Sequence, residues 1–261
     1  VNTGNGEFKV LTGNQIGILL VDYTIGAWKR AGRMPANPTV LKSIVSSEMA
    51  RKVAESNGVA CFDTFTGFKF LAQKKDQLEE SGAGNVLMAF EESNGYMYGD
   101  YVRDKDAVTA ALVLTEMGAW YADQGMTLND AMESLYKKYG FYGEKTLNLV
   151  MPGLDGLRKM AQLMADLREN PPVEIAGVAV KEQKDYADGS VVCVECGKKT
   201  TMELSGSNVL RYEMADGTSI IVRPSGTEPK VKVYILTLGA DEAERDANIA
   251  KYAAWAATLA E

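Results

Sequence analysis

Eight consecutive residues in the last part of the chain combine groups that bind phosphate. The segment reads Arg223-Pro224-Ser225-Gly226-Thr227-Glu228-Pro229-Lys230. Arg223 offers a planar fork of donors that matches a phosphate group, and Lys230 adds a second positive charge. Ser225 and Thr227 carry hydroxyl donors, and Gly226 is free to take a positive φ, which lets backbone N–H groups form an anion-binding nest. The segment predicts a site for a dianionic phosphate ester. A hydrophilic hairpin loop with an ordinary Arg and Lys is the alternative that composition leaves open.

A second candidate loop, Glu91-Glu92-Ser93-Asn94-Gly95, follows an apolar run at 86–90 that has the length of a buried strand. On an extended chain Glu91 and Ser93 share one face, where a carboxylate and a hydroxyl can bind the hydroxyls of a sugar. Glu91 and Glu92 point to opposite faces, which argues against an acid/base dyad and against a hydrolase that uses both. A solvated acidic turn is the alternative for this loop.

A third loop, Asp63-Thr64-Phe65-Thr66-Gly67-Phe68-Lys69, joins a short strand to a helix. Thr66 and Gly67 could present backbone N–H groups at the N-terminus of that helix, where anions are favoured. A capped helix start without any ligand is the alternative here.

Predicted strands alternate with predicted helices along the part of the chain that contains the Glu91 loop and the Thr66 loop. Strands are predicted at 39–45, 59–62 and 86–90, and helices at 13–30, 48–56, 68–80, 105–124 and from about 128 to 138. Such alternation predicts an α/β layer with parallel strands, in which ligands bind at the carboxyl ends of the strands. The loops at Thr66 and Glu91 both fall at that edge.

A second domain is expected to begin near Phe141. Its predicted strands are 145–150, 173–180, 191–194, 200–204, 208–214, 218–222 and 230–236, and its helices are 154–167 and 241–259. Strands gathered into hairpins with helices at both ends predict an α+β fold. The phosphate-binding segment is the loop between the strands at 218–222 and 230–236.

Composition restricts the classes of function. The 261 residues carry a formal charge of −7 and no histidine. The negative charge argues against nucleic acid and anionic membranes as partners, and the absence of histidine excludes Ser-His-Asp and Cys-His catalysis and most zinc sites. No transmembrane run or signal-peptide pattern is found, and three cysteines do not make a disulfide scaffold. The cytoplasm is therefore the expected location.

The motif Cys193-Val194-Glu195-Cys196 is a lone C-x-x-C pair. No second pair completes a zinc site, and the Gly-Lys-Lys at 197–199 indicates a hairpin tip rather than the helix start typical of a redox motif. Both cysteines are expected to be structural surface residues.

Three strings resemble one known family. They are T-F-T-G-F-K at 64–69, F-E-E-S-N-G at 90–95, and R-P-S-G-T-E-P-K at 223–230. They are similar to the cleft-entrance loop and the sugar-recognition loop of domain 3 and the phosphate-binding loop of domain 4 in the α-D-phosphohexomutases, the phosphoglucomutase/phosphomannomutase family. The resemblance implies that the substrate is bound by Glu91, Ser93, Asn94, Thr66, Gly67, Lys69, Arg223, Ser225, Gly226, Thr227 and Lys230.

Two positions depart from the family pattern. Asn94 stands where glycine is usual, and Phe68 stands where several bacterial members carry histidine. Together with D-K-D-A-V at 104–108, they point to the subgroup with phosphopentomutase-like and sugar-bisphosphate-synthase-like members. The choice among glucose, mannose and pentose substrates stays open.

The resemblance implies both a fold and an activity. The fold is a phosphohexomutase-type three-layer α/β/α domain 3 at 35–140, followed by an α+β domain 4 at 141–261. Residues 1–34 would be the end of domain 2 with its connecting helix. Members are isomerases that move a phosphoryl group between the 1- and 6- (or 5-) positions of a sugar, using a phosphoserine, Mg²⁺ and a bisphosphate intermediate.

Parts of the family's machinery do not match this chain. Its phosphoserine loop, usually T-x-S-H-N-P, cannot lie in a chain without histidine, its Asp-rich metal loop is not found, and the start reads as half a hairpin around Gly4-Asn5-Gly6. We expect no catalytic residue and no metal site here, with Mg²⁺ held by the full-length enzyme. The expected partners are a phosphosugar and the missing N-terminal half of the polypeptide, and the chain alone is expected to be inactive. A natural non-enzymatic sugar-phosphate-binding protein is the alternative.

Overall fold

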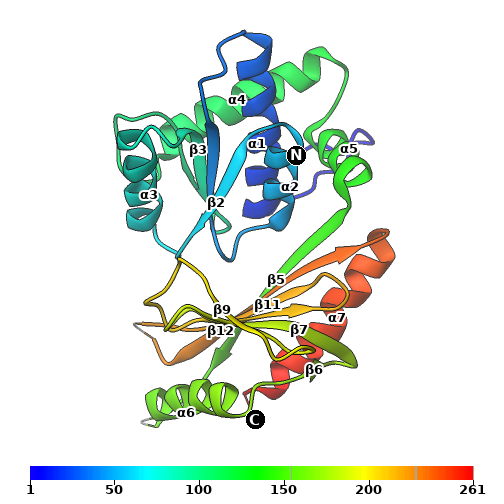
Figure 1. Cartoon of the computed structure of the whole chain (residues 1–261). Coiled ribbons are helices and arrows are strands. Elements are labelled where there is room, and N and C mark those ends of the chain that lie inside the picture. Colours follow the sequence, from blue (N-terminus) through cyan, green and yellow to red (C-terminus); the bar gives the residue numbers. More distant parts are fainter. Residues whose placement is uncertain (154, 227, 261) are drawn as a thin grey trace. The chain divides into compact units, whose positions relative to one another are not determined.

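The chain folds into two compact units, Val1–Gly140 and Phe141–Glu261. The structure is a computed structural model that describes residues 1–153, 155–226 and 228–260 (Figure 1). Each unit has its own sheet and its own covering helices. No helix in the described ranges is long and apolar enough to cross a membrane.

A four-stranded sheet forms the centre of the first unit, in the order β2-β1-β3-β4. Three of its strands are parallel: β1 (Pro38–Ser43), β2 (Ala60–Thr64) and β3 (Asn85–Glu91). β4 (Gly95–Met97) turns back antiparallel to β3. The predicted parallel α/β layer is thereby confirmed. β1 ends two residues earlier than predicted, because Ser46 N–H donates to the Ser43 carbonyl in a turn.

Helices lie on both faces of this sheet, so the predicted three-layer α/β/α arrangement is confirmed (Figure 1). α3 (Phe68–Glu80) packs against β1, β2 and β3, whereas α1 (Gly13–Arg30), α2 (Glu48–Ser56) and α5 (Leu128–Tyr139) contact one another, with α1 against β3. α4 (Ala107–Asp123) contacts α1, α5 and β4. Thr12 caps α1 in a capping box with Gln15, and Ser47 caps α2.

An antiparallel sheet of eight strands dominates the second unit, in the order β5-β12-β11-β10-β7-β8-β9 with β6 beside β7. The strands are β5 (Phe141–Val150), β6 (Glu174–Ile175), β7 (Val178–Asp185), β8 (Ser190–Cys193), β9 (Lys199–Thr201), β10 (Leu210–Met214), β11 (Ser219–Pro224) and β12 (Lys230–Gly239). Two helices, α6 (Gly156–Glu169) and α7 (Glu242–Thr258), complete the predicted α+β fold.

One strand prediction in this unit is wrong. The run 173–180 is not one strand but two, β6 and β7, which pair antiparallel. Ala176 and Gly177 turn the chain between them with φ values of 50° and 78°. Positive φ at two adjacent residues makes a tight hairpin turn. The buried positions change phase across this turn, from Ile175 before it to Val180 after it.

One face of this sheet is the hydrophobic core of the unit. Ile220, Val222, Val231, Val233 and Ile235 alternate along β11 and β12 and pack with Met160, Met164, Tyr252 and Ala256 of α6 and α7. Side chains one position along each strand point to the opposite face. That second face carries Arg211, Arg223 and Lys232.

Candidate functional site

The candidate site in the first unit lies at the carboxyl ends of its three parallel strands. β1 leads into residues 44–47, β2 into 65–67 and β3 into 92–94. Because parallel strands end at the same edge of a sheet, these three loops are neighbours. Two of them are the predicted loops at Thr66 and Glu91.

Glu91 joins these two loops. It is the last residue of β3, its exposed fraction is only 9%, and its Oε1 accepts a hydrogen bond of 2.5 Å from Gly67 N–H. Gly67 is the N-cap of α3, has no side-chain cap and sits at φ 116°. The Glu91 carboxylate therefore satisfies an open donor at the positive end of a helix, and it holds the two loops in one arrangement.

The turn after Glu91 differs from the extended chain that the sequence suggested. β3 ends at Glu91, residues 92–94 form a turn, and Asn94 sits at φ 62°. The prediction that placed Glu91 and Ser93 on one face of a strand is therefore wrong, although Ser93 and Asn94 are both exposed. Asn94 occupies a left-handed position that glycine tolerates best and asparagine next best, which explains the substitution there.

Glu91 and Glu92 have separate partners, so the two carboxylates do not form a dyad. Glu92 Oε2 accepts from the Ser43 hydroxyl at 3.3 Å, and Glu92 N–H donates to Ser46 Oγ at 3.1 Å. Ser43 and Ser46 also bond to each other at 2.8 Å. The loop after β1 thus supports the loop after β3, a role that sequence analysis missed.

Thr66 and Lys69 lie in the loop and first turn of α3, Thr66 half-buried and Lys69 exposed with its ammonium 4.7 Å from the centre of the Phe70 ring. Phe68 is buried, and its ring packs so closely on Gly95 that an added Cβ there would lie 2.4 Å from Phe68 Cε2. The lysine is therefore the accessible cation of this segment, and the aromatic residue is part of the wall.

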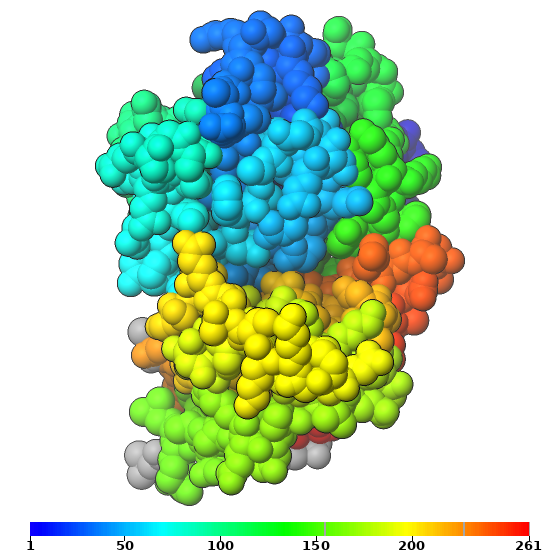
Figure 2. Space-filling view, in the orientation of Figure 1, coloured from blue at the N-terminus to red at the C-terminus, as the bar shows by residue number. Residues whose placement is uncertain are grey.

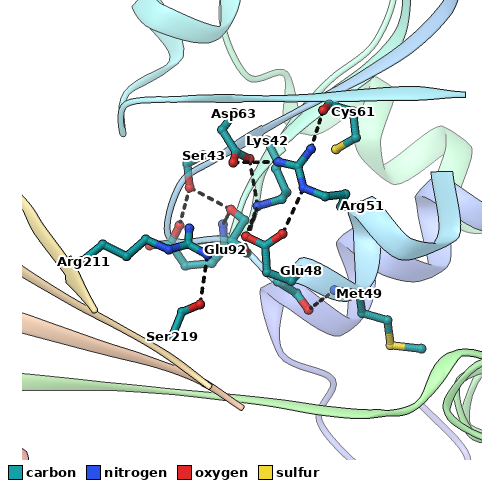
Figure 3. A network of polar contacts seen from close by, with 12 residues as sticks. Lys42, Ser43, Glu48, Met49, Arg51, Cys61, Asp63, Glu92, Arg211 and Ser219 are labelled. Atoms are coloured by element: carbon teal, nitrogen blue, oxygen red, sulfur yellow. Dashed lines mark hydrogen bonds and ion pairs between the residues drawn. The ribbon is translucent and has the colours of Figure 1, made fainter. Parts of the chain in front are cut away.

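A buried charge network supports the same edge of the sheet (Figure 3). Lys42 is fully buried, and its ammonium lies 2.9 Å from Oδ1 of Asp63 and 3.1 Å from Oε1 of Glu48. Arg51 contacts the same two carboxylates at 2.6 Å and 3.1 Å. Burial opposes the charge of Lys42, but Asp63 and Glu48 outweigh that effect and raise its pKa. A lysine directly after Val40 and Leu41 inside a predicted strand was the signal that could have revealed this network.

The candidate loop of the second unit is held by bonds within itself. Ser225 N–H donates to the Lys230 carbonyl at 2.8 Å, Glu228 N–H donates to Ser225 Oγ at 3.3 Å, and the Lys230 ammonium lies 2.6 Å from Glu228 Oε2. Thr227 lies outside the described residues. Gly226 does not sit at positive φ, so it does not use the conformational freedom on which the expected anion-binding nest rests.

Two cations face each other across the strands that carry this loop. Arg223 of β11 and Lys232 of β12 are direct cross-strand partners, both half-buried. Like charges opposite each other destabilise a sheet unless an anion offsets them. In the described part of the chain no hydrogen bond or ion pair engages the Arg223 guanidinium. Lys232 was missed, although the K-V-K-V alternation places it on the same face as Lys230.

A polar cluster continues along this face of the sheet, and Figure 3 labels two of its members, Arg211 and Ser219. Arg211 donates to Ser219 Oγ at 2.9 Å and lies 2.8 Å from Glu213, which Lys184 also contacts at 2.7 Å. Burial disfavours the charge of Glu213, but Arg211 and Lys184 outweigh it and lower its pKa.

Two family models match the chain, one for each unit. The model of the phosphoglucomutase/phosphomannomutase alpha/beta/alpha domain III matches residues 12–139, and the model of the phosphoglucomutase/phosphomannomutase C-terminal domain matches residues 148–254. The chain belongs to this family. Two of its candidate loops lie within the segment that matches domain III, and the third lies within the segment that matches the C-terminal domain.

Individual family members agree with this assignment. The phosphoglucomutase of Staphylococcus aureus strain RF122 is 37% identical over 233 residues, and that of strain N315 is 36% identical over 231 residues. Each alignment covers 88% of this chain and 41% of the relative. The chain therefore spans well under half the length of these phosphoglucomutases.

Solved structures share the fold. Parafusin, an exocytosis-sensitive phosphoprotein of Paramecium described as a phosphoglucomutase, superposes in its open form with a TM-score of 0.62 at 19% identity over 98% of this chain and 42% of its own. A phosphoglucomutase/phosphomannomutase family protein of Burkholderia thailandensis gives a TM-score of 0.53 at 16% identity, over 93% of this chain and 41% of its own.

The described residues do not fit the Mg²⁺ ion that the family resemblance implies. They contain no group of three or more acidic or cysteine side chains that could hold a metal ion. The carboxylates of Glu48 and Asp63 are close together, but Lys42 and Arg51 neutralise them. A cavity of about 400 Å³ in the second unit, beside Arg168, Lys184 and Tyr212, has none of the predicted site residues in its lining.

Proposed function

We propose that this chain is the substrate-binding half of a phosphosugar mutase. The observation that carries the proposal is the pair Arg223 and Lys232, set opposite each other beside the loop 225–230. Two cations held on a rigid hairpin favour a dianionic phosphate. The Glu91 carboxylate and the exposed Ser93 and Asn94 would bind the sugar hydroxyls.

The reaction that fits this division is transfer of a phosphoryl group between the 1- and 6- (or 5-) positions of a sugar through a bisphosphate. The residues of this chain would hold the phosphate that does not react and orient the sugar. Binding energy from that remote phosphate can then be used to orient the reacting group. The phosphoserine donor and Mg²⁺ would come from the N-terminal half of the polypeptide, in the cytoplasm, so we expect the isolated chain to have no isomerase activity.

Calorimetry with two substrates tests the binding proposal. We expect weak binding of glucose 1-phosphate or ribose 1-phosphate, and Arg223→Ala should weaken it by roughly 10-fold or more, because a charge-assisted contact is worth about 1.5–3 kcal/mol. Arg158→Ala is the matched control, since the Arg158 side chain is 74% exposed on α6. Equal loss in both variants would contradict a specific phosphate site.

Activity is tested separately with protein free of host mutase. Turnover of glucose 1-phosphate by the chain alone would contradict the expected inactivity. Recovery of turnover on adding an N-terminal half from a related mutase would support the proposal that this chain is the substrate-binding half.

A further inference from the structure

The motif Cys193-Val194-Glu195-Cys196 forms the tip of the β8–β9 hairpin. Gly197 N–H donates to the Cys193 carbonyl at 2.9 Å, Cys193 N–H donates to the Lys198 carbonyl at 2.9 Å, and Gly197 sits at φ 68°. This turn brings the two thiols together. The Cys196 thiol contacts Cys193 Sγ at 2.6 Å, and Cys196 N–H also points to Cys193 Sγ at 3.4 Å.

The pair is accessible, unlike the third cysteine. Cys196 is exposed and Cys193 half-buried, whereas Cys61 is buried. In Figure 2 the segment near residue 200, drawn in yellow, lies on the visible surface of the second unit. The hydrogen bond with Cys193 and a backbone bond from Lys198 lower the pKa of Cys196, whereas burial raises the pKa of Cys61 to about 12.

We propose that Cys193 and Cys196 form a redox-modification site, which low-molecular-weight disulfides such as oxidised glutathione convert to an internal disulfide. The geometry carries the inference: two adjacent sulfurs in a fixed turn on an accessible hairpin tip. The sequence predicts structural surface cysteines because this motif does not open a helix, as redox motifs usually do. A helix is only one way to hold two thiols close enough to form a disulfide.

The chemistry is two successive exchanges. The Cys196 thiolate attacks one sulfur of the small disulfide, which forms a mixed disulfide and releases one thiolate. Cys193, after losing its proton, attacks Sγ of Cys196, which forms the Cys193–Cys196 bond and releases the second thiolate. The two protons from the protein thiols neutralise the two leaving thiolates. Two protein thiols are thus oxidised while one small disulfide is reduced.

The position of the site predicts a local effect. β8 and β9 form one edge of the eight-stranded sheet, and all three residues of β9 are exposed. A disulfide across the turn would hold the tip of this edge hairpin closed. We expect slower amide exchange in the hairpin and no change in the core strands β11 and β12.

Thiol counting on the full 261-residue chain tests the proposal. Before oxidation two thiols should react with an aromatic disulfide reagent in the folded protein, and all three should react after unfolding. After incubation with excess oxidised glutathione, no thiol should react in the folded protein and one thiol should react after unfolding. The tryptic peptide 185–198, which contains both cysteines, should be lighter by two hydrogen atoms and resist alkylation.

Two variants make the test sharper. Cys193→Ser should stop at the mixed disulfide on Cys196, whereas Cys61→Ser should still form the internal bond. A stable glutathione adduct on the unaltered chain, a disulfide-linked dimer, or two thiols that persist after oxidation would each overturn the proposal. Peptide mapping of the unaltered chain gives the same decision if a variant fails to fold.

Discussion

The two candidate loops are held in place by different means. The loop of Glu91 in the first unit depends on contacts from distant parts of the chain: Gly67 at the start of α3, Ser43 at the end of β1 and Ser46 in the loop after β1. The loop at 225–230 in the second unit is closed by bonds among its own residues. The first loop is therefore a property of the assembled sheet, and the second is a property of one hairpin.

This difference predicts how each loop responds to damage elsewhere. Substitutions elsewhere in the first unit should disturb the Glu91 loop, because the residues that hold this loop belong to other parts of the parallel sheet and its connections. The loop at 225–230 should respond mainly to changes in its own residues and in the facing Lys232. The following substitutions test that contrast.

The largest effect is expected from Lys42→Met. The change removes the buried charge that Glu48 and Asp63 share and leaves Arg51 as the cation of these half-buried carboxylates, which costs about 3 kcal/mol. Urea unfolding followed by fluorescence reports it, since Trp28 and Trp120 lie in the first unit and Trp255 in the second.

The matched control for this prediction is Lys52→Met. Lys52 lies on α2, the helix that carries Glu48, and its side chain is exposed. This substitution should change the free energy of unfolding by less than about 0.5 kcal/mol. Comparable losses in the two variants would mean that the buried network does not support the first unit.

The next effect is on binding. Glu91→Ala removes the acceptor that joins the two loops of the first unit, so binding of a sugar phosphate should weaken roughly tenfold, or about 1.4 kcal/mol. Binding of inorganic phosphate should not change, because the phosphate site that we propose lies in the other unit. Glu80→Ala, an exposed change at the end of α3, is the control. Loss of phosphate binding in Glu91→Ala would contradict independent loops.

A pH experiment addresses the second unit. Arg211 and Lys184 keep the pKa of Glu213 below its ordinary value of 4.5. Its contribution to stability is therefore complete above pH 4.5 and is lost as the pH falls through 4.5 toward the lower pKa of the folded state. Glu213→Gln should lower the free energy of unfolding at pH 7 by about 1 kcal/mol.

In the same variant, the free energy of unfolding should depend less strongly on pH under acidic conditions. Between about pH 5 and pH 3 urea unfolding should show a smaller loss of stability in Glu213→Gln than in the unaltered chain. Parallel curves would show that Glu213 does not couple the second unit to pH.

Of all these substitutions, the replacement of Asn94 by glycine should have the smallest effect. Asn94→Gly should change the free energy of unfolding by at most about 0.5 kcal/mol, since both residues accept φ near 62°. Asn94→Val should cost about 1–2 kcal/mol, because a β-branched residue is strained in that region. Equal stability of the two variants would mean that the turn rearranges.

Local sequence patterns by themselves determined much of this protein. The capping residues Thr12 and Ser47, the strand–helix alternation at 39–90 and the hairpin around residue 217 all follow from neighbours in sequence. The loop at 225–230 is recognisable for the same reason, because its bonds close between residues that are near one another in the chain. Period-2 alternation would also have identified Lys232.

Only the tertiary structure decided the rest. The bond from Gly67 to Glu91 spans 24 residues, and that from Ser43 to Glu92 spans 49. The charge of Lys42 is acceptable in a buried strand because α2 and β2 bring Glu48 and Asp63 to it. Such contacts depend on which strands become neighbours in the sheet, and the residue types alone do not state that order. The sequence determined which groups could bind a phosphosugar, and the packing of the parallel sheet decided how the Glu91 carboxylate is held.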